Sequence, residues 1–217
     1  TTWTGYSSNI TRFDGLIPYG PFGTNFVSYT FDAGNGFSIM GAAEQGSDDF
    51  EADYTNISAR AGGRAIDDYV PHLVAGAKFA TGMFAASVVA GWDSNEEEVS
   101  VKGRLDVTPN DMFTFFVMGA WSDIDNGNNA GDNPLGNYYA QWGGDWAAWA
   151  GFTVNASERV AINTEFGVNE LDDYSLAADV GFAVTPDLKV TVGGFYTNNF
   201  DVDNDAIGGN IRTRFSF

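Results

Sequence analysis

The residues best suited to act on a dissolved solute are basic side chains spaced two apart. Lys102 and Arg104 form one such pair, and Arg212 and Arg214 form another near the carboxyl end of the chain. In a β-strand, residues i and i+2 lie on the same face, so each pair would project into the same space. Fixed positive charges there can attract anions and shape an electrostatic field, and no covalent chemistry is implied.

Strand parity adds further charged residues to the same polar faces. The full predicted set of solute-facing residues is Glu44, Lys78, Lys102, Arg104, Asp106, Asp145, Glu165, Asp179, Lys189, Arg212 and Arg214. Two interpretations stay open. Either the basic members select among solutes, or the charges only solvate a wide water-filled space and pair with their neighbours.

Most of the 29 acidic residues lie elsewhere, in predicted loops. They cluster around Asp48, Glu96, Asp123, Glu170 and Asp201. With only 10 Lys and Arg the formal net charge is -19, which makes the chain a poor candidate for binding nucleic acid. If these loops share one mouth, their charge should concentrate cations there at low salt.

One acidic cluster resembles the start of a calcium-binding loop. Its candidate ligands are Asp201, Asp203 and Asp205, which are spaced two apart. Ala206 stands where such loops carry glycine, and Arg212 stands where they carry the bidentate glutamate. The sequence therefore predicts no cofactor, with loop-bound Ca²⁺ as its metal candidate.

Catalytic chemistry finds little support in the sequence. The chain has no cysteine and a single histidine, His72, and no serine stands out as the partner for a nucleophilic dyad. Acid pairs such as Asp172 and Asp173 are better explained as solvated loop charge. We therefore predict that the protein is not an enzyme.

Alternation of apolar and polar residues predicts the elements that hold these charges. The pattern is clearest where Val99, Val101 and Leu105 alternate with Lys102 and Arg104. Similar segments are predicted at 27–31, 37–43, 73–79, 84–92, 113–121, 146–154, 160–168, 174–182, 190–196 and 207–217. A fragment around Trp3 would add one more strand and bring the total to about twelve.

The predicted connections alternate between tight turns and mostly longer polar loops. Tight turns with Gly, Asn or Pro are predicted at 32–36, 80–82, 108–111, 155–158 and 185–187. Longer loops are predicted at 45–71, 122–144 and 198–206, and short ones at 93–97 and 170–173. Tight turns at one end and longer loops at the other are typical of bacterial outer-membrane β-barrels, whose closure satisfies every backbone polar group.

Aromatic residues at the predicted strand ends fit the two interfaces of a bilayer. The predicted girdle consists of Phe79, Trp92, Trp121, Trp146, Phe182, Phe215 and Phe217. No stretch approaches the roughly 20 apolar residues that a spanning helix needs. The predicted fold class is therefore all-β, a transmembrane antiparallel β-barrel, with residues 1–217 in a single domain. A soluble barrel with an aromatic core is the alternative.

Several motifs are similar to those of the alphaproteobacterial general porin family, whose members are trimeric diffusion channels. The most specific is Gln-Trp-Gly-Gly-Asp-Trp-Ala-Ala-Trp-Ala-Gly at 141–151, and others lie at 29–38, 44–46 and 66–78. The resemblance covers the later part of the family pattern. It implies that this chain is an N-terminally incomplete part of a barrel of roughly sixteen strands. Family members also carry a cysteine-bearing start and an inward-folded constriction loop, and we identify neither in this sequence.

The resemblance implies a homotrimeric porin, integral to the bacterial outer membrane, with outer-membrane lipid and lipopolysaccharide as partners. We expect a water-filled channel for passive diffusion of ions and small hydrophilic solutes. The alternative is a structural or adhesive barrel with a plugged lumen, whose acidic loops bind divalent cations or a partner. Conductance across a planar bilayer separates the two hypotheses.

Overall fold

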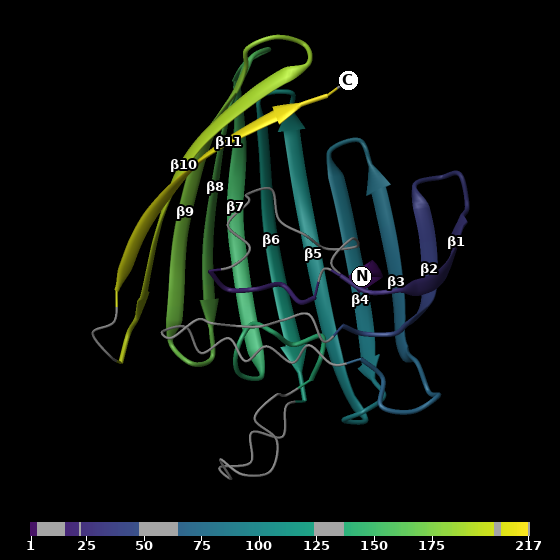
Figure 1. Ribbon diagram of the computed structural model, residues 1–217. Helices are drawn as coiled ribbons and strands as arrows, with labels where there is room; N and C mark the ends of the chain where they lie inside the picture. The colour runs from purple at the N-terminus through teal and green to yellow at the C-terminus, as the bar shows by residue number, and fades with distance from the viewer. Residues whose placement is uncertain (4–15, 22, 48–64, 124–136, 202–204, 217) are drawn as a thin grey trace.

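The computed structural model describes residues 1–3, 16–21, 23–47, 65–123, 137–201 and 205–216. These residues form one antiparallel sheet of eleven strands, each paired with its neighbours in chain order (Figure 1). The strands are β1 (Phe26–Asp32), β2 (Phe37–Glu44), β3 (His72–Thr81), β4 (Phe84–Asp93), β5 (Glu98–Asn110), β6 (Phe113–Ser122), β7 (Trp146–Ser157), β8 (Val160–Asn169), β9 (Asp173–Ala183), β10 (Leu188–Asn199) and β11 (Ala206–Phe215). Within the described ranges, there is no helix long and apolar enough to span a membrane.

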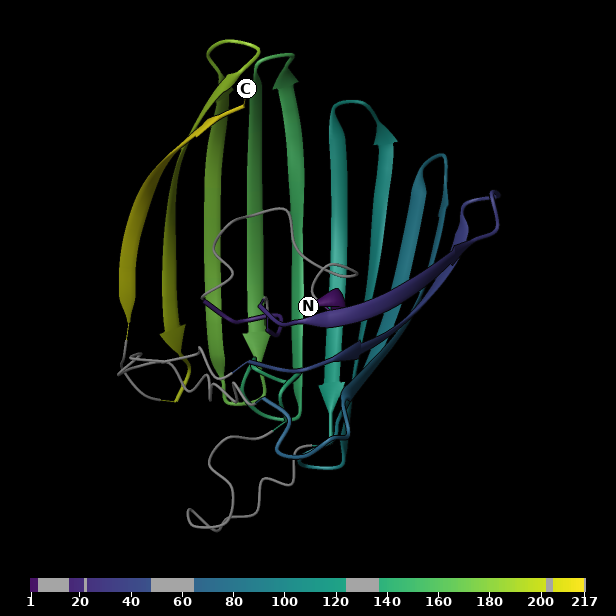
Figure 2. The same ribbon diagram turned by 45° about the vertical axis from the view of Figure 1, so that its right-hand side comes forward.

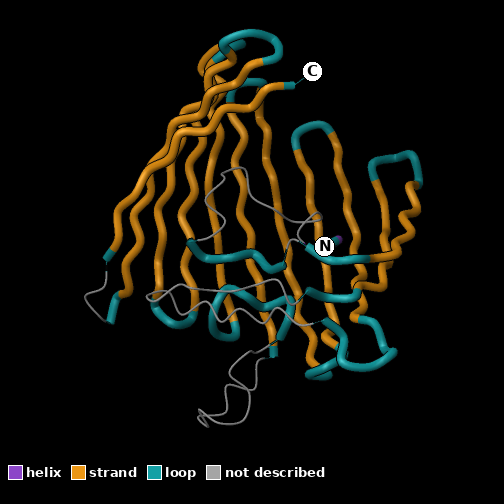
Figure 3. Tube along the Cα trace, viewed as in Figure 1, coloured by secondary structure: helices purple, strands orange, loops and turns teal. Residues whose placement is uncertain are grey.

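The connections alternate in the way that the sequence predicts. Tight turns gather at the end of the sheet where β11 finishes, and the remaining connections gather at the opposite end (Figures 1 and 3). The β1–β2 turn requires glycine at Gly36, because φ is 86° there and an added Cβ would lie 2.0 Å from the Ala80 carbonyl oxygen. Irregularities in register, between Val107 and Asn110 and between Asn155 and Ser157, place the β5–β6 and β7–β8 turns slightly later than predicted.

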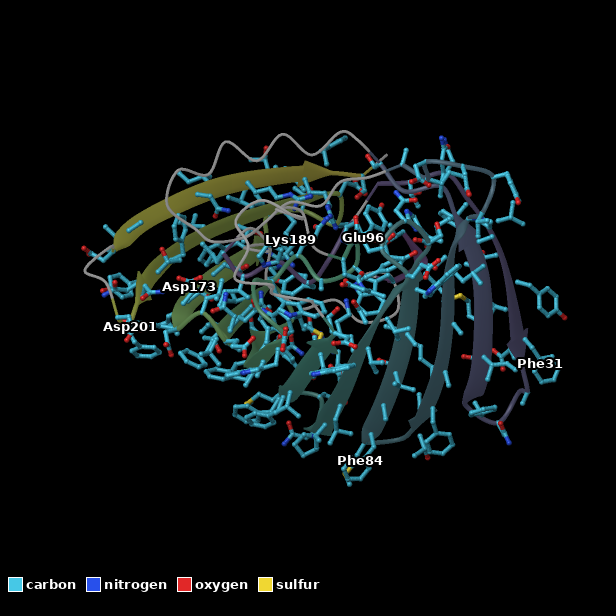
Figure 4. The ribbon with its side chains drawn as sticks, turned by 90° about the horizontal axis from the view of Figure 1, so that it is seen from below. Phe31, Phe84, Glu96, Asp173, Lys189 and Asp201 are labelled. Carbon is cyan, nitrogen blue, oxygen red and sulfur yellow. The ribbon has the colours of Figure 1, made fainter. Side chains whose placement is uncertain are left out.

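The sheet has an apolar convex face and a concave face where the buried side chains lie. Val27, Val117 and Leu176 are among the large apolar residues exposed on the convex face. Figure 4 shows Phe31 and Phe84 pointing away from the concave side of the sheet. The period-2 pattern therefore assigned the two faces correctly, and the predicted antiparallel all-β fold is confirmed.

The curved sheet is open between its first and last strands. In the described residues, β1 pairs with β2 and β11 pairs with β10, and no ladder joins β1 to β11 (Figure 2). Each of these strands therefore presents one unpaired row of backbone N–H and C=O groups. Trp3, around which a twelfth strand was predicted, is not part of the described sheet, and residues 4–15 lie outside the described residues.

Trp3 lies on the concave side, where it is fully buried. Its ring packs 5.2 Å from that of Tyr139 and 6.4 Å from that of Trp142, so its indole buries more area there than it would on an outer strand face. Residues 16–21 lie on the same side, with Ile17 and Tyr19 also buried. An inward-folded segment, which the sequence did not reveal, is therefore present in this chain.

Candidate functional site

Two pieces of chain cover the middle of the concave face. We call residues 1–3 and 16–21 the inner segment, and residues 137–142 between β6 and β7 the inner loop. Figure 2 shows the inner segment crossing the concave side of the sheet. Its buried residues join those of the inner loop and of β2, β3, β4, β6 and β7 in one hydrophobic cluster. The wall charges beneath these two pieces are therefore removed from water.

Glu44, at the end of β2, holds the inner segment and the inner loop together. Its Oε1 accepts hydrogen bonds of 2.6 Å from both the backbone N–H and the hydroxyl of Thr2. Its Oε2 accepts a 3.2 Å bond from the Tyr139 hydroxyl. The carboxylate is only 1% exposed. Burial raises the pKa of the Tyr139 phenol, which keeps this hydroxyl protonated and able to donate.

Lys102, in β5, contacts the inner segment from the wall side. Its Nζ donates a 2.8 Å hydrogen bond to the Tyr19 carbonyl oxygen and lies 4.6 Å from the centre of the Trp3 ring. The same carbonyl accepts a 2.9 Å bond from Trp3 Nε1. Lys102 is completely buried. The charge predicted to face solute therefore faces a carbonyl and an indole ring.

Residues of β7 and β8 fix the rest of the inner segment. Trp149 Nε1 donates to the Ile17 carbonyl oxygen at 3.1 Å, and the Tyr19 hydroxyl donates to Glu165 Oε1 at 3.1 Å. The Tyr19 and Trp149 rings meet edge to face at 5.6 Å. Glu165 is only 4% exposed, so this predicted solute-facing residue is buried and contacts the inner segment instead.

The inner loop is anchored by a buried polar group at the ends of β3 and β4. His72 Nδ1 lies 3.3 Å from Asp93 Oδ1 and accepts a 3.0 Å bond from the Ser94 backbone N–H. Asp93 Oδ2 accepts a 2.7 Å bond from the Tyr138 N–H, and the Tyr138 ring stacks 5.1 Å from His72. The sequence did not reveal this group. The signal in the sequence was that His72 and Asp93 fall on the polar face of adjacent strands. His72 is opposite Glu44, and Asp93 is opposite Glu98.

Other wall residues interact with their neighbours on the sheet, and two of them form a local ion pair. Arg104 and Asp106 share one strand face, with Nη2 to Oδ1 at 2.6 Å and Nε to Oδ2 at 2.8 Å. The Arg104 guanidinium also lies 4.3 Å from the Phe116 ring centre. Lys78 is half-buried on β3, in the same cross-strand row as Arg104 through Ser87. Asp179 is buried on β9, where Oδ1 accepts a 2.6 Å bond from Asn163 Nδ2.

The last two strands carry exposed basic residues. Lys189 stands directly opposite Arg214, and Arg212 stands opposite Thr191. All three basic side chains are exposed, and Figure 4 shows Lys189 on the concave side. Within the part of the chain that the structure describes, none of the three forms a hydrogen bond or an ion pair. Lys189 and Arg214 are like charges placed opposite one another, which is unfavourable for the sheet. Their exposed side chains leave this positive charge facing water.

Two other predictions concern Asp145 and the calcium site. Asp145 lies in the bend before β7, where its backbone N–H donates to Glu170, and so it is not part of a wall strand as predicted. The preceding residues Gly143 and Gly144 have positive φ, so regular strand geometry begins only after them, at Trp146. The proposed calcium ligand Asp203 lies outside the described residues, and Asp201 and Asp205 are exposed.

The predicted aromatic girdle lies mainly on the convex face. Five of its members are exposed there: Phe79, Trp121, Trp146, Phe182 and Phe215. Trp92 is half-buried, and Phe217 lies outside the described residues. Aromatic rings exposed near the ends of strands suit the interfaces of a bilayer, where one part of the ring meets lipid and another meets water.

Residues 1–214 match the family described as the Porin subfamily. Porin Omp2a of Brucella melitensis biotype 1 is 34% identical over 222 residues, which cover 100% of this chain and 55% of the relative. Porin Omp2b of Brucella suis biovar 1 is 35% identical over the whole chain and 58% of the relative. The chain thus spans a little over half the length of these relatives.

A solved structure shares the fold at low sequence identity. The outer membrane channel DcaP of Acinetobacter baumannii superposes with a TM-score of 0.58 and 14% identity, over 93% of this chain and 68% of that chain.

Proposed function

The chain belongs to the porin subfamily, and from that premise we propose that it contributes the wall of an outer-membrane channel. The channel passes ions and small hydrophilic solutes by diffusion, and no catalytic step is involved. The observation that carries the proposal is the match to the porin family over residues 1–214, combined with a sheet whose convex face is apolar and exposed and whose concave face carries the charged residues. A membrane channel built from strands requires this division.

The conducting form needs a closed sheet. An unpaired strand edge in hydrocarbon leaves backbone groups unsatisfied, at a cost of several kcal/mol each. We propose that further strands pair with the free edges of β1 and β11 in the conducting protein. The greater length of the relatives leaves room for such strands.

The partners of the channel are also part of the proposal. Outer-membrane lipid would contact the convex face, and lipopolysaccharide would meet the acidic loop end, where divalent cations could bridge acidic groups of the loops to anionic lipid. We further propose a homotrimer, following the resemblance to trimeric porins. Val27 and Tyr29, which are 79% and 74% exposed on β1, support a role for this part of the convex face in contact with lipid or a second subunit.

Planar-bilayer recording of the full-length protein tests the channel. We expect stepwise openings, in groups of three if the assembly is a trimer. The alternative of a structural or adhesive barrel has one observation in its favour, since the inner segment and inner loop fill part of the concave face. A well-folded, membrane-inserted protein that leaves the bilayer silent would favour that alternative and reject the channel.

A further inference from the structure

Two neighbouring cations on one strand face have different surroundings. Lys102 and Arg104 are both in β5 and point to the same side of the sheet. Lys102 is fully buried under the inner segment, whereas Arg104 lies beside the half-buried carboxylate of Asp106. A hydrated solute cannot contact the Lys102 ammonium without displacing Trp3 or Tyr19. The Arg104 side chain is itself only 10% exposed and is paired with Asp106, whereas Arg212 on β11 is exposed.

The Lys102 ammonium joins the two described parts of the inner segment. It donates to the Tyr19 carbonyl oxygen from residues 16–21 and lies under the Trp3 ring from residues 1–3. Trp3 Nε1 donates to the same carbonyl, so three groups meet at one point. An added Cβ at Gly20 would lie 2.3 Å from Trp3 Nε1, and φ is 122° at this glycine. The contact is therefore built from a specific backbone geometry as well as from the lysine.

We infer that Lys102 is a positioning residue of the proposed channel, which clamps the inner segment to β5 and so sets the cross-section left for solutes. Arg212, which is exposed on β11, acts on the solutes themselves. The inference about cross-section rests on the proposed channel function. The clamp does not, because it can be measured on folded protein that carries no current.

The clamp is tested by thiol labelling of the full-length protein. The described chain has no cysteine, so Ile17→Cys, at a residue that is 2% exposed, would report the release of the inner segment, once any cysteine elsewhere in the full-length protein is replaced. We expect Lys102→Met to raise the labelling rate about tenfold, the change expected for loss of one charged hydrogen bond. Lys102→Arg should restore slow labelling, because it keeps a donor and a cation over the ring. Arg212→Met, at an exposed basic residue on β11, is the control and should leave the rate unchanged.

The outcomes of labelling decide the clamp in either direction. Unchanged labelling in Lys102→Met would overturn it, and so would equal acceleration in Arg212→Met. If Lys102→Met does not fold, Trp3→Phe tests the same point, because it removes the indole N–H and weakens the ring contact. Accelerated labelling in Trp3→Phe would support the clamp, and unchanged labelling would reject it.

Single-channel recording tests the consequence for solutes. Lys102→Met should give several conductance levels and admit larger polyethylene glycols, while its reversal potential in a KCl gradient stays at the wild-type value. Arg212→Met should shift the reversal potential and keep one steady level. A reversal potential in Lys102→Met that moves as far as in Arg212→Met would overturn the positioning role, since the charge would then act on ions directly. If even the wild-type protein is silent, the channel proposal fails and the labelling result still decides the clamp.

Discussion

The concave face places charged residues in two different settings. Across β2 to β8, Glu44, Lys102 and Glu165 lie under the inner segment and inner loop, buried and hydrogen-bonded to them. We call this region the covered wall. Across β10 and β11, Lys189, Arg212 and Arg214 are exposed, and we call this region the exposed wall. The same alternation of residues along the strands produces both regions, so parity fixes which face a charge occupies, and the chain packed over it determines what the charge does.

The covered wall should therefore matter for stability and the exposed wall for ion preference. A buried polar group that loses its partner carries the full penalty of desolvation, whereas a charge in water can lose a neighbour at little cost. Substitutions matched between the two regions test this division. The expected effects run from several kcal/mol in the covered wall to small, salt-dependent changes at the mouth.

The largest effect is expected at Glu44. Glu44→Ala removes the acceptor for the Thr2 N–H, the Thr2 hydroxyl and the Tyr139 hydroxyl. With about 1–3 kcal/mol for each buried donor left unsatisfied, we expect a loss of roughly 3 kcal/mol or more in the free energy of unfolding. Urea titration of the full-length protein in micelles measures it. Glu44→Gln keeps an acceptor and should lose less, and a cost below about 1 kcal/mol for Glu44→Ala would contradict the covered-wall assignment.

A smaller effect is expected where the inner loop packs on β4. A Cβ at Gly91 would lie 2.6 Å from the Tyr139 ring, whereas a Cβ at Gly119 meets nothing within 4 Å. Gly91→Ala should therefore cost about 1–3 kcal/mol through overpacking. Gly119→Ala, in the neighbouring part of the sheet, should stay within about 0.5 kcal/mol. Equal unfolding midpoints for the two variants would show that the inner loop does not pack on the wall as described.

The sequence predicted the sheet well because its alternation records burial on one face of every strand. The alternation predicted the order of turns and loops and the outward, exposed placement of Phe79, Trp121 and Phe182. The prediction was wrong for Trp3. A single aromatic residue shows no alternation, so the sequence could not separate a strand from another placement. Its contact with Lys102 joins residues 99 positions apart, and strand parity contains no information about such a contact.

The wall charges show the same limit. Lys102 and Arg212 both belong to basic pairs on the polar face, and nothing in their spacing separates a buried cation from an exposed one. The buried group of His72, Asp93 and Tyr138 was missed for a related reason. It combines a strand start, a strand end and a loop, which meet only after the inner loop folds back on the sheet.

On the exposed wall, Arg212→Ala should leave stability within about 0.5 kcal/mol, since this side chain has no described partner to lose. We expect the ratio of cation to anion permeability to rise about twofold, because one unit charge in water acts weakly on a passing ion. Reversal potentials in a KCl gradient measure the ratio. Thr213→Ala, which changes the opposite face of the same strand, is the control. A large loss of stability in Arg212→Ala would erase the distinction between the two regions.

The smallest effect is expected at the acidic loop end, where Glu96 and Glu97 lie between β4 and β5. Glu97 is exposed, and Figure 4 labels Glu96 in the view from this end. Their charge should favour cations at low salt, where the Debye length is about 30 Å at 0.01 M, and should have almost no effect at 1 M, where it is about 3 Å. The double variant Glu96→Gln and Glu97→Gln should therefore lower cation preference at 0.01 M KCl and match the wild type at 1 M. A change that persists at 1 M would place these carboxylates within contact distance of the ion path, and anion preference of the wild type at low salt would show that the exposed wall outweighs the mouth.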